Sequence, residues 1–146
     1  MFVTTSFALS VAVPSARQPD SLAPPALAAR IIEVYDDFLA KGVDEPFSSV
    51  TILGGDPTGD AGWPYTESIL QALHERGVRT DILVVTNGLR LSHRAAEFLA
   101  LQPANVIVRL QGNFGDPAEG VAHIGDSFMR LKNGVERVTG LSLIHI

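Results

Sequence analysis

The sequence contains no cysteine among its 146 residues. Disulfide bonds, cysteine nucleophiles, thiolate zinc sites and cysteine-ligated iron–sulfur clusters are therefore excluded within this chain. The histidines lie far apart and lack the paired spacing of metal ligands. They are His74, His93, His123 and His145. We interpret each of them as a surface or capping residue and predict no metal site made by this chain.

Basic clusters and long apolar runs are also absent from the sequence. Lys and Arg number 11 against 16 Asp and Glu, which gives a formal net charge of −5. Binding to nucleic acid requires concentrated positive charge, so we expect no nucleic acid and no membrane surface as partner. No apolar run reaches the roughly 18 residues that a membrane-spanning helix needs. Residues 1–14 are apolar but lack the basic start of a signal peptide, so we predict a cytoplasmic protein.

The hydrophobic content of 46% is enough for one domain with a core. Apolar, β-branched segments predict strands over 2–5, 49–53, 81–86 and 105–110. Apolar residues spaced three and four apart predict helices over 26–41, 65–76, 92–101 and 126–138. Residues 6–25, with four prolines, are predicted to be a long connection, and residues 111–125 a loop.

This strict alternation of strand and helix predicts an α/β fold with a parallel sheet and right-handed crossovers. Four strand–helix units fit either a small open sheet or part of a (β/α) barrel. The periodicity of the sequence does not distinguish these two architectures.

The second predicted strand ends in Gly54-Gly55-Asp56-Pro57. Glycine permits positive φ angles and leaves room for a ligand against bare backbone. Ligands of α/β folds bind at the carboxyl ends of parallel strands, so this turn is a candidate binding site. The alternative is a purely structural turn in which Asp56 caps the following helix.

Four motifs in the same order resemble the radical S-adenosylmethionine (radical SAM) family, and the resemblance covers nearly the whole chain. The turn at 54–57 resembles the family's Gly-Gly-Glu-Pro, and Thr86-Asn87-Gly88 resembles its Thr-Asn-Gly. Residues 106–112 stand where the family often has a strand ending in Ser-Leu-Asp-Gly. Residues 125–128, followed by 133–135, are similar to its Gly-x-Ser-Phe opening of the next helix. The resemblance implies part of a (β/α) barrel from enzymes that reductively cleave S-adenosylmethionine at a four-iron four-sulfur cluster.

The sequence departs from this family at the cluster. The family holds its cluster with Cys-x3-Cys-x2-Cys in the loop after the first strand. With a first strand at 2–5, Phe7, Val11 and Pro14 stand at that spacing. Because these side chains have no donor for iron, we expect the chain to be inactive as written. The alternative is an apolar loop that fits the spacing by chance.

The resemblance also implies a set of residues that bind S-adenosylmethionine, here Gly54, Gly55, Asp56, Pro57, Asn87 and Arg109. In the family the carboxylate of the glycine turn contacts the amino group of the methionine moiety, and Asp56 is one methylene shorter than glutamate. Arg109 and Gln111 stand where the family commonly has Ser and Asp. Arg109 could pair with a cofactor carboxylate or form a surface salt bridge. The alternative function is a non-catalytic module that binds S-adenosylmethionine or another small metabolite.

A complete barrel of this family has six strand–helix units, so we predict that residues 1–140 form an incomplete domain of this kind. Residues 141–146, Leu-Ser-Leu-Ile-His-Ile, resemble the translation of an adapter used in sequencing libraries. We predict that they are a non-native tail. The sequence gives no information on the substrate.

Overall fold

The computed structural model describes residues 6–14, 22–88, 90–111, 129 and 133. Strands and helices alternate along the chain, which confirms the α/β prediction. They are β1 (Phe7–Val13), α1 (Pro24–Ala40), β2 (Phe47–Gly54), α2 (Trp63–Glu75), β3 (Ile82–Thr86), α3 (His93–Ala100) and β4 (Val106–Leu110). The predicted strand at 2–5, the motif at 125–128 and the tail at 141–146 lie outside the described residues. The predicted loop at 111–125 and helix at 126–138 do so too, except for Gln111, Met129 and Asn133.

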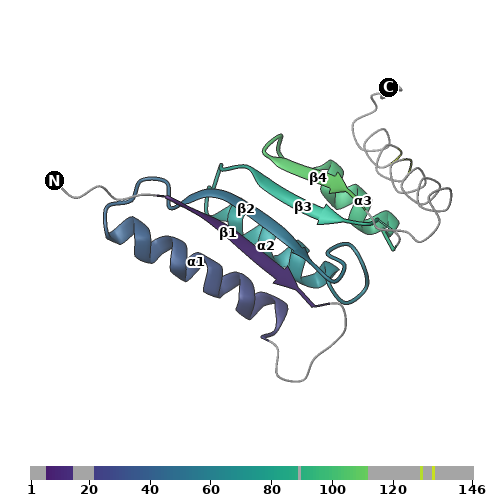
Figure 1. Ribbon diagram of the computed structural model, residues 1–146, viewed down its shortest axis with the longest axis horizontal. Helices are drawn as coiled ribbons and strands as arrows, with labels where there is room; N and C mark the ends of the chain where they lie inside the picture. Colours follow the sequence, from purple (N-terminus) through teal and green to yellow (C-terminus); the bar gives the residue numbers. More distant parts are fainter. Residues whose placement is uncertain (1–5, 15–21, 89, 112–128, 130–132, 134–146) are drawn as a thin grey trace.

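The four strands form one parallel sheet in the order β1-β2-β3-β4. Figure 1 shows the strands side by side in chain order, with α1 next to β1 and α3 next to β4. Because every right-handed crossover steps in the same direction, successive helices fall on the same face of the sheet. A doubly wound sheet instead reverses its strand order and carries helices on both faces. The arrangement is therefore consistent with a partial β/α fold of the barrel type.

One hydrophobic core lies between the sheet and the helices. Residues of alternating position on each strand point into it, as the two-residue period of a strand requires. Core residues include Val11, Val50, Ile52 and Val84 from the strands and Ile31, Ile69, Leu73 and Leu99 from the helices. On the opposite face, Ser10, Thr51, Leu83 and Ile107 share one register row and are at least partly exposed.

The structure corrects the predicted beginning of the fold. The segment expected to be a connection over 6–25 contains β1, whose side chains Phe7, Leu9, Val11 and Val13 alternate with exposed residues. The Phe7 ring packs on Phe38, with centroids 4.9 Å apart. This period of two is a strand signal. The prolines on which the predicted connection depended lie at Pro14 and beyond, after the end of β1.

The correction also removes the predicted cluster loop. Phe7 and Val11 lie inside β1, and only Pro14 follows it. The prediction of a loop is therefore wrong for Phe7 and Val11, whereas Pro14 does follow the strand.

Prolines explain two smaller differences at the helix starts. Helices α1 and α2 each begin two residues earlier than predicted and carry proline in their first turn. Proline is tolerated there because its missing N–H would have no intrahelical acceptor.

Helix α3 begins with a side-chain cap. Ser92 precedes the helix, and its Oγ accepts a hydrogen bond of 3.1 Å from the backbone N–H of Ala95. We expect Ser92→Ala to lower the free energy of unfolding by about 1 kcal/mol, measured by urea denaturation. Ser68→Ala, within α2, is the control and should leave stability nearly unchanged because alanine favours helix interiors. Equal stability of the two variants would contradict a role for the cap.

Candidate functional site

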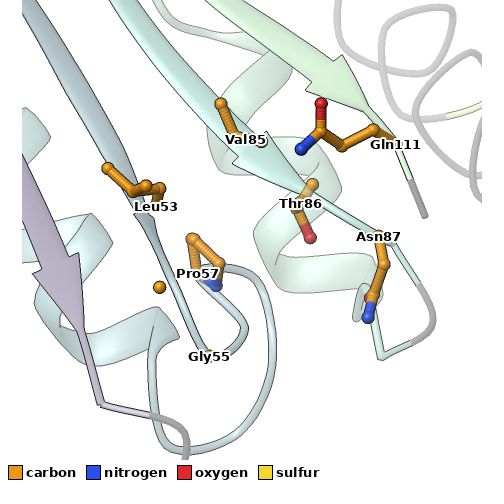
Figure 2. Close-up of a pocket in the computed structure, with 8 residues that line it drawn as sticks. Leu53, Gly55, Pro57, Val85, Thr86, Asn87 and Gln111 are labelled. Carbon is orange, nitrogen blue, oxygen red and sulfur yellow. The ribbon is translucent and has the colours of Figure 1, made fainter. Parts of the chain in front are cut away.

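A pocket of about 210 Å³ lies at the edge of the sheet where β2, β3 and β4 end. We call it the carboxyl-edge pocket; its lining is Leu53, Gly54, Gly55, Pro57, Val85, Thr86, Asn87 and Gln111. Figure 2 shows Leu53, Gly55 and Pro57 on one side, and Val85, Thr86, Asn87 and Gln111 on the other. The structure thus brings the two predicted strand-end turns together at the edge where α/β folds bind ligands.

The first wall of the pocket depends on Gly54. This residue has φ of +118°, and a Cβ built on it would lie 2.4 Å from the carbonyl oxygen of Val13. The next N–H, of Gly55, donates to that same oxygen at 3.2 Å. Glycine is therefore required by both the backbone angle and the close approach of β1, and its bare backbone borders the pocket.

Asp56 belongs to a polar network beneath the turn. Its Oδ1 lies 3.3 Å from the backbone N and the Oγ1 of Thr58, and 3.2 Å from Oγ1 of Thr86. The two threonine hydroxyls are 2.8 Å apart, and the N–H of Gly88 donates to Oγ1 of Thr86 at 3.0 Å. The hydroxyls of Thr58 and Thr86 make three contacts, with Asp56 and with each other, but have only two protons to donate. The network joins the turn after β2 to the turn after β3.

Small residues allow the chain to fold tightly around Asp56. A Cβ on Gly59 would lie 2.5 Å from Oδ2 of Asp56, and one on Gly62 would lie 2.1 Å from its carbonyl oxygen. Thr66, in α2, donates a hydrogen bond of 2.7 Å to the carbonyl of Pro57. The turn after β2 is thus held both by the contacts of Asp56 with Thr58 and Thr86 and by the hydrogen bond from Thr66 to Pro57.

Sequence reasoning missed Thr58, Gly59 and Gly62 in this turn. The available signal was a threonine two residues after an aspartate, which is typical of a turn closed by the aspartate side chain. Thr58 and Thr86 are 2% and 3% exposed, so their hydroxyls need partners within the protein.

The predicted binding residues divide into two groups. Gly54, Gly55, Pro57 and Asn87 line the carboxyl-edge pocket, whereas Asp56 is not part of its lining. The expected contact between the Asp56 carboxylate and a ligand amino group stays a prediction.

Arg109 also lies outside the lining of the pocket. It is exposed on β4, paired in register with Val85, and within the described chain it makes no ion pair. The alternative of a surface salt bridge is therefore not found among the described residues. Gln111 takes part instead, because its side chain lines the pocket and its N–H donates to the Thr86 carbonyl at 2.9 Å.

The donor groups decide which cofactors fit. The chain has no thiolate for an iron–sulfur cluster, so this group does not fit. In the part of the chain that the structure describes, no group of three or more His, Cys, Asp or Glu is placed to hold a metal ion. The carboxyl-edge pocket presents bare glycine backbone and neutral polar side chains, which are groups common in sites for small polar ligands. None of the helices described here combines the length and hydropathy needed to span a bilayer.

Comparison with known proteins gave no matching family model, no matching curated protein and no matching solved structure. The resemblance to radical SAM domains consequently depends on the strand-end motifs themselves.

Proposed function

We propose that this chain is a non-catalytic module that binds a small polar metabolite, with S-adenosylmethionine as the first candidate, in the carboxyl-edge pocket. The observation that carries the proposal is the pocket itself, where bare backbone at Gly54 and Gly55 faces the polar residues Thr86, Asn87 and Gln111. Exposed backbone groups and a few placed polar side chains are what a small-ligand site requires.

The resemblance to radical SAM domains supports S-adenosylmethionine as the candidate. The two motifs at Gly54-Gly55-Asp56-Pro57 and Thr86-Asn87-Gly88 follow neighbouring strands of a parallel sheet, and Asp56 connects them. Reductive cleavage is not part of the proposal, because the sequence has no cysteine to hold the cluster that supplies the electron.

The size of the pocket limits what it encloses. Small-ligand pockets usually measure at least about 300 Å³, and this one measures about 210 Å³. We infer that the pocket encloses one part of a ligand and that the rest of the ligand lies outside the pocket, at the open edge of the sheet.

The proposal is tested by titrating the full chain with S-adenosylmethionine and measuring both the heat of binding and the amide chemical shifts. We expect saturable binding with a dissociation constant on the order of micromolar, and shifts concentrated at Gly54, Gly55 and Asn87. Asn87→Ala should weaken binding about threefold to tenfold, since it removes one polar partner.

Asn105→Ala is the matched control. Asn105 lies at the opposite edge of the sheet, where its side chain donates to the Thr80 carbonyl at 2.8 Å. This variant should lose some stability but keep its affinity. Absence of heat and of shifts at millimolar ligand would contradict the proposed function.

A further inference from the structure

The four-stranded sheet has one face that is open to solvent. The described helices α1, α2 and α3 cover the face that forms the core. Leu53 and Ile107 point to the other face, where they are 37% and 48% exposed. Leu83 and Val85 of β3 share that face and are only partly buried. Parallel sheets normally have both faces covered, so this apolar surface is suited to a protein partner.

Both edge strands of the sheet are also accessible. A groove of about 350 Å³ is lined by Leu9 and Val11, which face the helices, and by Ser10 and Ala12, which face away from them. Because the groove reaches both faces of β1, it runs over the free edge of this strand. At the opposite edge, every residue of β4 keeps some exposed surface. The backbone groups of such edges are able to pair with a further strand.

The two edge strands are complementary in the size of their side chains. On the open face β1 presents only Ala8, Ser10 and Ala12, whereas β4 presents Ile107 and Arg109. Small barrels fill their interior by placing small side chains beside large ones. Arg109 is next to the last residue of β4, so its long side chain is able to keep its charged group in water at the end of the sheet. Strand β1 of one copy therefore fits beside β4 of another.

The size of the open face favours closure at both edges. Strands lie about 4.8 Å apart and rise about 3.3 Å per residue, so the open face measures roughly 20 Å by 20 Å, or about 400 Å² in each copy. Stacking two such faces alone buries about 800 Å², and stable interfaces bury about 1,200 Å² or more. Pairing β1 of each copy with β4 of the other adds two edge contacts. It also makes a ring of eight strands, whose interior is just wide enough for side chains to fill.

We propose that the open face and the two edge strands are the interface between two copies of this chain, which close into a ring of eight parallel strands. Each copy places β4 beside β1 of the other, so the pair has twofold symmetry and leaves no strand edge free. All eight strands point the same way, and both carboxyl-edge pockets open at the same end of the ring.

Sedimentation of the full chain tests the pair. We expect a species of twice the 15.6 kDa of one chain. Ile107→Lys and Ser10→Lys each place an unpaired charge inside the ring, and each should raise the dissociation constant of the dimer at least about tenfold. Leu101→Lys is the control, because Leu101 follows α3 and is 65% exposed away from the sheet, and should stay dimeric.

Three results of these measurements would overturn the proposal. They are a parent chain that stays monomeric, a parent chain that forms open polymers, and lysine variants that dimerise as the parent does. A well-dispersed amide spectrum establishes that each variant is folded.

A spin label tests which strands meet. The sequence has no cysteine, so Glu33→Cys in α1 provides a single attachment site. Labelled chains are mixed with ¹⁵N-labelled chains, so every broadened amide signal reports a contact between copies. The ring places α1 of one copy nearer to β4 than to β1 of the other, and we expect stronger broadening in β4. Stronger broadening in β1 would show that the copies pair through β1 alone and would overturn the ring.

Discussion

Replacing Gly54 by alanine is expected to lower the free energy of unfolding by about 3 kcal/mol, the sum of backbone strain and a steric conflict. The residue has φ of +118°, which alanine adopts only with strain. Its new Cβ would also lie 2.4 Å from the oxygen and 2.7 Å from the nitrogen of Val13. Because both atoms belong to the backbone of β1, no side-chain rotation relieves the contact. Urea denaturation followed by circular dichroism measures the loss.

The variant Gly77→Ala separates the energetic cost of the backbone angle from the cost of the steric contact. Gly77 follows α2 with φ of +79°, and a Cβ there would meet no atom within 4 Å. This variant should lose only about 1 kcal/mol, the cost of the left-handed angle alone. An equal loss in the two variants would show that the close approach of β1 to Gly54 contributes nothing.

The alternation of strands and helices was predictable because each described element after β1 has its own local signal. Segments such as Ile82–Thr86 are apolar and β-branched, and α2 has apolar residues on one face and ends before Gly77. The order of the strands in the sheet was not predictable in this way, because hydrophobic periodicity indicates which residues are buried and not which strands are neighbours. The β1 error has a physical cause as well. Alanine and serine at Ala8, Ser10 and Ala12 weaken the contrast with the buried positions, so the strand resembled an apolar loop.

The site was predictable only in outline. Glycines and polar residues at strand ends indicate a binding edge, because parallel strands end together, and Gly54, Gly55 and Asn87 do line one pocket. The position of Asp56 in the motif does not determine whether its carboxylate points toward a ligand or toward the protein. Asp56 turns to Thr58 and Thr86 because both hydroxyls are buried and need a partner, which is a property of the packed turn.

Thr86→Val is expected to cost about 2 to 3 kcal/mol of unfolding free energy, although valine has nearly the same volume. The change removes the hydroxyl that contacts Thr58 and Asp56 and that accepts from the N–H of Gly88. Thr58 is 2% exposed, so its hydroxyl keeps its 3.3 Å contact with Asp56 but has no access to water as a substitute for Thr86. Thermal and urea unfolding measure the loss. Thr80→Val is the control, since its hydroxyl makes a hydrogen bond to the Ser48 carbonyl at a less buried position, and should cost about 1 kcal/mol or less.

A double variant tests whether Thr58 and Thr86 act as one network. Thr58→Val alone leaves the Thr86 hydroxyl with one partner fewer, and Thr86→Val alone does the same to Thr58. In the double variant neither hydroxyl remains to be left unpaired, so the loss of stability should be smaller than the sum of the two single losses. Strict additivity would contradict the network. A coupling of 0.5 kcal/mol or more would instead support a network in which the two hydroxyls join the turn after β2 to the turn after β3, and thereby hold both walls of the pocket in place.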